Sequence, residues 1–459
     1  MTTAMLNRAR VFRDRGLRAS IVTFDYNPNY AREIAVLKSQ NRMSDDTDLL
    51  NIFNYYSSLN TARLPARRTS NPAPRQVDHL DKRQGVVLRE EYSELGIKVR
   101  EQVRDTSSNL IREERYFTPD GFCYLTVLVN PDTSVPTAIF VHFIDGRPTE
   151  HYPNNRKWRT AWIDRMAQEE HVTPIVICDG PGSAPTVMGM ATGLARRIYQ
   201  IHINHFEAPF SYGSPIKPNH NAIFSKLDIL DRVVVLTAEQ RMDVVRDYGR
   251  PERLTVIPNF CSIGKASTIE KIPGRVSMLV RFHPQKRVED AIRAFSLVLE
   301  SSPAATLYIY GRGSEKANYH SLIRHLGLEG GVVIEDYTDD ARKVLASSVC
   351  TVLTSTYEAF SLSIAESLSA GTPAVAFDCP YGPASLLEDG RNGYIIRDRD
   401  IDALGRAILQ LVNNPGLAAQ LGDEGRRIMV ERYSDEIIFQ QWSELFDELD
   451  QIAGSPTGG

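Results

Sequence analysis

The sequence has little that would indicate a secreted, membrane-spanning or nucleic-acid-binding protein. Its five cysteines are scattered and form no CxxC pair, so the sequence indicates neither a disulfide framework nor a cysteine-based metal site. No apolar run approaches the ~18 residues that a membrane-spanning helix needs. The segment Met1–Arg18 carries five arginines and one aspartate without an apolar core, which is not the pattern of a secretion signal. We therefore expect a cytoplasmic protein with buried, reduced cysteines.

Length and charge set further bounds. The net charge is −4, the apolar content is 42% and the charged content is 24%, as in ordinary soluble enzymes. This balance does not favour a nucleic-acid partner. At 459 residues the chain is too long for one core, and two or three domains are expected.

The second half of the chain alternates short apolar runs with amphipathic segments, which predicts a doubly wound parallel sheet. The predicted strands are Val276–Val280, Leu307–Tyr310, Val332–Glu335, Cys350–Leu353, Ala374–Phe377 and Tyr394–Ile396. The predicted helices between them include Val288–Glu300, Glu315–Leu326, Asp340–Ala346 and Leu362–Ala370. In such a sheet, ligands bind beyond the carboxyl ends of the strands.

The first half gives a second, less regular pattern. Part of another parallel sheet is predicted from Ala138–Phe143, Ile175–Cys178, Ile198–Ile203 and Val233–Leu236. An antiparallel insertion at about 70–135 is predicted from strand-like runs and the turn signal Pro119-Asp120-Gly121. Before it, Arg63–Arg75 is either a solvated loop or a basic track for a polyanionic acceptor. Because the chain opens on a helix, we expect a first strand and its Gly-rich turn to be missing upstream.

Charged residues follow three strands of the C-terminal sheet. Glu358 comes after Cys350–Leu353, and Glu366 lies eight residues later on the next helix, which should begin near Ser361 as its N-cap. Free N–H groups at that helix start can bind a diphosphate, and a carboxylate can accept from two vicinal hydroxyls. On spacing alone, the two glutamates could equally be a loop acid and a solvated helix acid.

The neighbouring loops make the binding interpretation stronger. Arg281 and Lys286 follow another strand and could neutralise a diphosphate without a metal, although a solvated basic loop is the alternative. The turn at Gly311 lets a backbone approach a ligand closely. Three such loops on one sheet favour a phosphate-containing ligand.

The segment from Glu358 to Glu366, continuing through Ala370-Gly371-Thr372-Pro373, resembles the C-terminal signature of family 4 retaining glycosyltransferases of the GT-B fold. The resemblance covers about residues 275–400. It implies that Glu358 contacts the transferred hexose, Glu366 binds the nucleotide ribose, and Arg281 and Lys286 neutralise the diphosphate. The backbone at Phe360, Ser361 and Leu362 would bind phosphate too. The resemblance implies no cofactor and no metal, in agreement with the lack of a DxD motif in these loops.

The N-terminal half is similar to poly(glycerol-phosphate) α-glucosyltransferases and to adhesin-modifying GlcNAc transferases. This likeness rests on Met1–Ala9, the β-rich insertion and Ile201–Phe206. It implies that His202 hydrogen-bonds the transferred sugar, with His205 as a second candidate, although either could be a structural histidine. Asp179 could line the acceptor site, and a plain turn is the alternative.

Together these observations predict an α/β protein with two facing Rossmann-like domains. The expected domains are an N-terminal acceptor-side domain over 1–262, a C-terminal nucleotide-sugar-binding domain over 272–432, and a helix over 433–453 that packs back across both. The expected activity is metal-independent transfer, with retention, of glucose or N-acetylglucosamine from a UDP-sugar. The expected acceptor is a hydroxyl of a cell-surface polymer such as poly(glycerol phosphate) teichoic acid.

Several alternatives stay open. The acceptor could be a serine-rich protein or another glycan, and the chain could be a non-catalytic partner subunit that kept the fold. A pyridoxal-phosphate phosphorylase of the same fold has no support, because no lysine pocket is indicated. The resemblance implies that the insertion serves self-association or acceptor contact, and an exposed β edge would suit either, so a homo-oligomer is expected. At most peripheral membrane association is expected. The sequence leaves the sugar, the nucleotide, the acceptor and the oligomeric state undetermined.

Overall fold

The structure, a computed structural model, describes residues 3–40, 43–44, 47–61, 76–82, 85–266 and 268–454. The chain divides into two compact units. The first comprises residues 1–11, 177–184 and 197–459, and the second comprises residues 12–176 and 185–196. Within the described ranges, no helix combines the length and apolar character needed to cross a bilayer.

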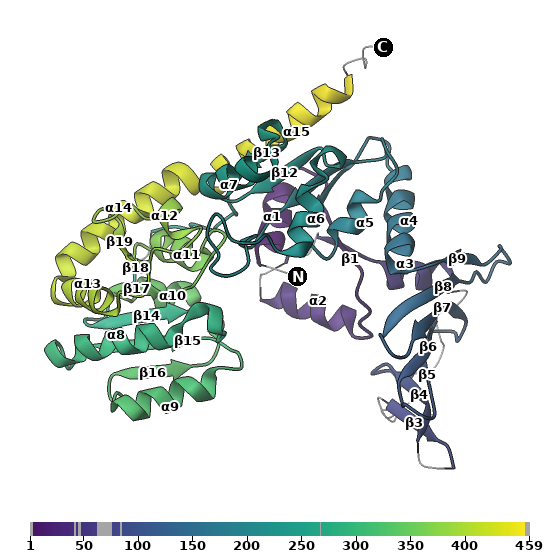
Figure 1. Ribbon diagram of the computed structural model, residues 1–459, viewed down its shortest axis with the longest axis horizontal. Helices are drawn as coiled ribbons and strands as arrows, with labels where there is room; N and C mark the ends of the chain where they lie inside the picture. Colours follow the sequence, from purple (N-terminus) through teal and green to yellow (C-terminus); the bar gives the residue numbers. More distant parts are fainter. Residues whose placement is uncertain are drawn as a thin grey trace. The chain divides into compact units, whose positions relative to one another are not determined.

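The first unit contains a six-stranded sheet with the order β16-β15-β14-β17-β18-β19, and every pairing in it is parallel (Figure 1). Its strands are β14 (Arg275–Leu279), β15 (Thr306–Tyr310), β16 (Val332–Glu335), β17 (Cys350–Leu353), β18 (Ala374–Phe377) and β19 (Gly393–Ile396). All four residues of β17 and of β18 are buried. This explains the apolar runs without polar alternation that predicted the sheet.

Helices alternate with these strands along the chain and form a hydrophobic core with the sheet. They are α8 (Val288–Ser301), α9 (Lys316–Leu326), α10 (Ala341–Ala346), α11 (Leu362–Ser369), α12 (Pro383–Leu386), α13 (Ile401–Asn413) and α14 (Pro415–Tyr433). Ile292 and Phe295 of α8 and Ile408 of α13 have no exposed surface and lie in one cluster with Val276 of β14. The strands and helices predicted for this half are confirmed, with bounds that differ by at most one residue.

A four-stranded sheet, β10-β11-β12-β13, lies largely in the same unit. Its strands are β10 (Ile175–Cys178), β11 (Arg196–Gln200), β12 (Arg232–Val235) and β13 (Leu254–Val256). The associated helices are α1 (Thr3–Asp14), α5 (Ala184–Met188), α6 (Pro218–Phe224), η1 (Leu227–Ile229), α7 (Ala238–Tyr248) and η2 (Pro251–Arg253). The pairs β11–β12 and β12–β13 are parallel, as a Rossmann-like sheet requires.

The last helix, α15 (Asp435–Gly454), follows α14 and contacts the four-stranded sheet region. Its apolar face is buried at Ile438, Trp442, Leu445 and Leu449. Glu448 accepts from Arg232 of β12 at 2.8 Å, and Asp435 accepts from Arg10 of α1 at 3.2 Å. The predicted domain boundaries themselves stay a prediction.

The second unit is built around a seven-stranded antiparallel sheet with strands in sequence order from β3 to β9. They are β3 (Gln76–Leu80), β4 (Val86–Tyr92), β5 (Lys98–Arg104), β6 (Ile111–Phe117), β7 (Cys123–Asn130), β8 (Val135–Val141) and β9 (Glu150–Tyr152). The unit also contains a parallel pair, β1 (Ser20–Thr23) with β2 (Asp48–Asn51), and helices α2 (Tyr30–Ser39), α3 (Ile52–Leu59) and α4 (Asn155–Gln168). Rings of Phe53, Tyr116 and Trp158 pack at centroid distances of 5.0 to 5.3 Å in its core.

The antiparallel insertion is therefore present, and the described part of it extends to Tyr152, beyond the predicted end at about 135. The prediction that Ala138–Phe143 is a strand of a parallel sheet is wrong. Residues 131–134 form a turn that leads directly into β8, with Asn130 paired to Val135. So short a connection gives an antiparallel hairpin, because a parallel crossover needs a dozen or more residues. The Arg63–Arg75 segment lies outside the described residues.

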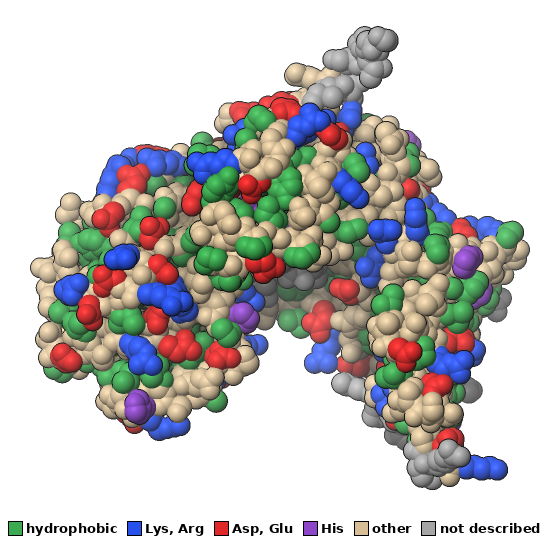
Figure 2. Space-filling model, viewed as in Figure 1, with side chains coloured by type: hydrophobic (Ala, Val, Ile, Leu, Met, Phe, Trp, Pro, Cys, Tyr) green, Lys and Arg blue, Asp and Glu red, His purple; other side chains and the backbone are tan. Residues whose placement is uncertain are grey.

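Basic and acidic side chains are interspersed on the face of the molecule shown in Figure 2. The near-neutral total charge of the chain agrees with this mixture. A strong preference for an anionic ligand must therefore come from individual cations at a defined site.

Candidate active site

Two loops meet at the carboxyl edge of the six-stranded sheet. One follows β14 and contains η3 (Pro284–Lys286), and the other follows β17. They are joined by hydrogen bonds from Thr356 N to Gln285 O and from Gln285 Nε2 to Tyr357 O, both at 2.8 Å. Thr354 Oγ1 donates to Lys286 O, also at 2.8 Å. Because β14 and β17 are neighbours in the sheet, segments about 70 residues apart form one rigid surface.

Lys286 and Glu358 face each other across these loops. Lys286 Nζ lies 2.6 Å from Glu358 Oε1, and Ser355 Oγ donates to the same oxygen at 2.6 Å. Their side chains are only 13% and 11% exposed. An ammonium has three donors, so Lys286 can hold Glu358 in place and still donate to a second anionic group.

The backbone of Glu358 is fixed from the other side by the loop after β18. Glu358 N donates to Pro380 O at 2.8 Å, and Tyr381 N donates to Glu358 O at 3.0 Å. Tyr381 is buried, and its hydroxyl donates to Asp243 of α7 at 2.9 Å. A Cβ at Gly382 would approach Glu358 Cβ to 3.1 Å, so a glycine is needed for this close packing.

Arg281 lies at the same edge but is not paired. Its side chain is exposed, and within the described ranges it has no hydrogen-bond or ion-pair partner. Burial raises the pKa of the neighbouring Tyr357, and the charge of Arg281 acts against this increase. The structure thus leaves one guanidinium free beside the Lys286–Glu358 pair, although the role predicted for it stays a prediction.

Helix α11 begins at the predicted place, after the predicted N-cap residue. Ser361 is its N-cap residue, but its φ of 66° is left-handed and its side chain makes no cap hydrogen bond. A capping serine needs an extended backbone for its hydroxyl to reach the N–H groups ahead, so Ser361 is the N-cap residue as predicted but its hydroxyl does not cap the helix. The Ser361 hydroxyl is instead buried without a partner among the described residues. The N–H groups of Phe360, Ser361 and Leu362 donate to no described residue either, so this helix start can accept an anion.

Glu366 lies one turn into α11 and is half-buried. Burial raises the pKa of its carboxyl to about 7. No described cation forms an ion pair with it. A carboxylate in such surroundings gains from any ligand that donates hydrogen bonds to it, such as a pair of hydroxyls.

Gly311 is required by the packing of the protein itself. A Cβ at this position would lie 1.9 Å from the carbonyl oxygen of Val280 and 2.7 Å from the ring of Phe282. The prediction took this glycine as a place where backbone approaches a ligand. The contact with the β14 loop accounts for it without a ligand.

His202, just beyond β11, belongs to a second cluster. Its Nε2 lies 2.7 Å from Asp179 Oδ1, and Asp179 also accepts two hydrogen bonds from Arg8. Asp179 therefore contacts His202 and Arg8, where the sequence suggested a contact with the acceptor. Arg8 was missed by the sequence analysis, because one arginine among five in Met1–Arg18 carries no local signal.

His205 cannot contact a sugar in this structure, because it is buried in the core. Its side chain has no exposed surface and packs against Phe206, Phe224 and Tyr381, with ring centroids 4.0, 5.6 and 6.0 Å away. Burial, together with the charges of His220 and Lys217, lowers its pKa to about 3. It is a neutral core residue.

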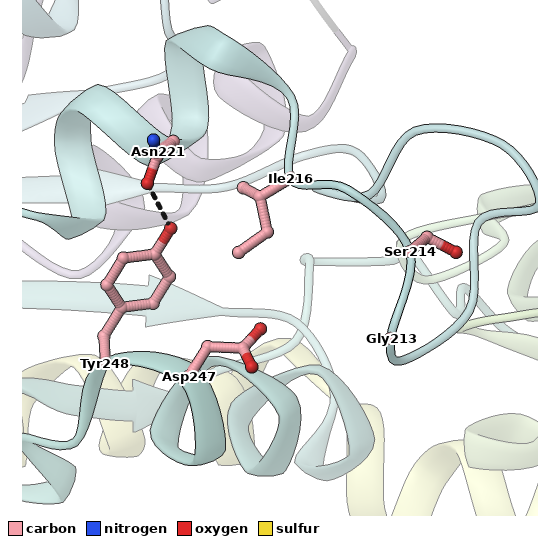
Figure 3. Close-up of a pocket in the computed structure, with 6 residues that line it drawn as sticks. All are labelled: Gly213, Ser214, Ile216, Asn221, Asp247 and Tyr248. Atoms are coloured by element: carbon pink, nitrogen blue, oxygen red, sulfur yellow. Dashed lines mark hydrogen bonds between the residues drawn. The ribbon is translucent and has the colours of Figure 1, made fainter.

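A separate pocket of about 450 Å³ lies between the loop after β11 and α7 (Figure 3). Its lining includes Gly213, Ser214, Asp247 and Tyr248, and the Tyr248 hydroxyl donates to Asn221 at 2.7 Å. None of the predicted site residues lines it.

Several known proteins are similar to this chain. Residues 265–428 match the family described as "Glycosyl transferases group 1". The chain is 29% identical to the poly(ribitol-phosphate) alpha-N-acetylglucosaminyltransferase of Staphylococcus aureus, over 97% of this chain and 96% of that protein. It is 25% identical to the poly(glycerol-phosphate) alpha-glucosyltransferase of Bacillus subtilis, over 82% of this chain and 56% of that protein.

Solved structures of similar proteins share the fold of this chain. The crystal structure of TarM matches with a TM-score of 0.87 and 27% identity, over 97% of this chain and 95% of that one. An S. aureus TarM variant in complex with UDP, alpha-GlcNAc-glycerol and Fondaparinux matches equally well. Pneumococcal GtfA, with a TM-score of 0.73 at 17% identity, is similar in fold alone.

The fold is that of the GT-B glycosyltransferases, and the family match supports glycosyltransferase activity. Residues 265–428 resemble the group 1 glycosyl transferase family, and nearly the whole chain is similar to TarM.

Proposed function

We propose that this protein transfers N-acetylglucosamine or glucose from a UDP-sugar to a hydroxyl of a polyol-phosphate polymer of the teichoic acid type. The observation that carries the proposal is the likeness to the S. aureus poly(ribitol-phosphate) enzyme over 97% of the chain, insertion included. A likeness confined to the C-terminal domain would support the donor side alone.

In this proposal, the UDP-sugar donor binds at the carboxyl edge of the six-stranded sheet. The diphosphate lies between Arg281, Lys286 and the start of α11, where two cations and free N–H groups offset its charge. Glu366 accepts hydrogen bonds from the two ribose hydroxyls. Glu358, held by Lys286 and Ser355, contacts the hexose. His202 contacts the hexose from the other sheet.

The reaction needs charge stabilisation more than a protein nucleophile. As the bond between the sugar and the diphosphate breaks, negative charge grows on the leaving phosphate, and Lys286 and Arg281 stabilise it. In a retaining reaction of this kind, a phosphate oxygen of the donor accepts the proton of the acceptor hydroxyl, which attacks on the same face. In this scheme two cations take the place of a metal. The proposed transfer is therefore metal-independent, and it proceeds with retention.

A donor and acceptor screen tests it. UDP release is followed with UDP-N-acetylglucosamine or UDP-glucose, each with poly(ribitol phosphate), poly(glycerol phosphate), a serine-rich peptide or no acceptor. We expect polymer-dependent release with one sugar, unaffected by EDTA, and an α-linked product by NMR. Release with the serine-rich peptide alone would contradict the acceptor assignment. Lack of both release and UDP binding would contradict the enzyme assignment and favour a partner subunit.

Two further predictions complete the proposal. A homo-oligomer assembled through the antiparallel insertion would show as a multiple of the 51.6 kDa chain mass in light scattering. A cytoplasmic location, where UDP-sugars are available, would show by fractionation of cells producing the protein.

A further inference from the structure

A continuous set of polar contacts connects the C-terminal helix to His202. The guanidinium carbon of Arg8 lies 5.6 Å from the ring centroid of Trp442 on α15. Arg8 NH1 donates to Asp179 Oδ1 at 2.8 Å, NH2 donates to the other carboxylate oxygen, and NH1 also donates to the amide oxygen of Gln200. His202 Nε2 lies 2.7 Å from Asp179 Oδ1. Arg8 is 7% exposed, and the side chains of Asp179 and His202 are partly buried.

The charge state of Asp179 decides where the His202 proton lies. Burial raises the pKa of Asp179, but the charge of Arg8 and the hydrogen bonds from His202 and Arg8 outweigh burial, and the pKa lies well below its usual range. An ionised carboxylate can only accept, so Nε2 of His202 carries a hydrogen. Nδ1, which bonds to no described residue, is then the nitrogen left for a ligand. In the neutral ring, Nδ1 accepts a hydrogen bond from a hydroxyl.

We propose that Arg8 is a positioning residue that acts on the transferred sugar through Asp179 and His202. The inference rests on the proposed function, in which His202 contacts that sugar. Two parallel hydrogen bonds from Arg8 fix the plane of the carboxylate, and the carboxylate fixes both the orientation and the tautomer of the imidazole. The ring of Trp442, which has no exposed surface, also contacts the guanidinium. The C-terminal helix thereby supports the geometry of the site.

A purely structural salt bridge is the competing explanation, and kinetics can separate the two. We expect Arg8→Gln to lower kcat by about 10- to 100-fold with the donor KM within about threefold, because a misoriented group affects the chemical step. Arg8→Lys should recover little, because an ammonium cannot form two parallel hydrogen bonds. Arg10→Gln is the matched control. Arg10 lies on the same helix and pairs with Asp435 of α15, so its loss should leave kcat within about twofold.

A double-mutant cycle shows whether Arg8 acts through His202. In a His202→Ala background, Arg8→Gln should have little further effect on kcat, because the group that it positions is gone. Equal fold losses in both backgrounds would overturn the proposal. Because removal of Arg8 leaves the largely buried carboxylate of Asp179 without its permanent cation, Arg8→Gln is also tested together with Asp179→Asn, which removes both charges.

A second measurement does not depend on transfer activity. Long-range ¹⁵N–¹H NMR spectra of histidine-labelled protein report the tautomer of each ring, and His202→Gln identifies the His202 signal among the ten histidines. We expect a hydrogen on Nε2 in the wild type and a tautomer mixture in folded Arg8→Gln. A wild-type signal for hydrogen on Nδ1, or an unchanged tautomer in Arg8→Gln, would overturn the proposal. If the tautomer result holds but no UDP-sugar is turned over, the proposed function fails and the positioning network stands.

Discussion

The ammonium of Lys286 and the carboxylate of Glu358 lie 2.6 Å apart, although 72 residues separate them in sequence. Each follows a strand of one parallel sheet, and the two strands, β14 and β17, are neighbours. We propose that Lys286 stabilises the departing diphosphate and also holds Glu358 against the sugar. Glu358 is fixed by contacts with Lys286, Ser355 and the backbone of Pro380, and such fixed groups suit electrostatic stabilisation of a transition state.

Replacement of Lys286 should affect the chemical step strongly. We expect Lys286→Met to lower kcat by about 10²–10³-fold, the scale for loss of one charge-stabilising donor. Steady-state kinetics of UDP release measures this effect. Lys316→Met is the matched control, because Lys316 forms an equally short 2.6 Å ion pair with Asp336 on a more exposed surface. A wild-type kcat in Lys286→Met would remove this residue from the mechanism.

Arg281 allows a cleaner test, because its exposed side chain has no ion-pair partner within the described ranges. We expect Arg281→Ala to lower kcat by roughly 10²–10³-fold while the thermal unfolding temperature stays within about 1 °C of the wild type. Arg293→Ala, at an exposed position on α8, should change neither quantity. If Arg281→Ala lost stability and activity together, its role would be structural.

The C-terminal sheet could be predicted from the sequence almost to the residue, and the reason is physical. Strands such as Cys350–Leu353 are buried on both faces, so their apolar runs end where burial ends. Parallel topology then places the loops that follow them at one edge, so the sequence predicts that Glu358 and Lys286 lie at the same edge. Local sequence and global fold specify the same arrangement here.

Other features depend on contacts that no local pattern reveals. The apolar run at β8 fits a parallel or an antiparallel strand equally well, and only the short turn after Asn130 decides between them. His205 and His202 are three residues apart, yet one is enclosed by aromatic rings and the other bonds to Asp179. Ser361 has a left-handed backbone and lies close to Gly382, which is 21 residues away in sequence. Each depends on residues distant in sequence.

Donor affinity should depend on pH through Glu366. Its pKa of about 7 means that the carboxyl gains a proton as the pH falls through neutrality and then loses acceptor capacity for the ribose hydroxyls. We expect calorimetry to show UDP binding weaken by roughly tenfold between about pH 8 and about pH 6. Glu366→Gln is the control, since it should bind weakly throughout and retain only the dependence due to protonation of UDP itself. Parallel pH curves for the two proteins would contradict the role given to Glu366.

Stability at acid pH should depend on His205. Its pKa is about 3 in the folded protein, because burial opposes the charged form, against about 6.5 for an unfolded chain. Between these values the unfolded chain binds a proton that the folded protein does not, so the free energy of unfolding falls as the pH falls. When the pH is lowered from about 7 to about 5, we expect the free energy of unfolding to fall by about 2 kcal/mol less in His205→Phe than in the wild type. Urea denaturation at both values measures the difference.

The comparison of two pH values separates titration from packing. A phenylalanine beside Phe206 and Phe224 will change the absolute stability through its volume, but this contribution is the same at both pH values and cancels in the difference. His320→Phe, at an exposed position on α9, should leave the pH dependence unchanged. The buried His220, whose pKa burial and the charge of Lys217 lower to about 4, accounts for part of the acid sensitivity that His205→Phe retains. An identical pH dependence in His205→Phe and the wild type would mean that His205 is accessible to protons and is not the neutral core residue that its burial indicates.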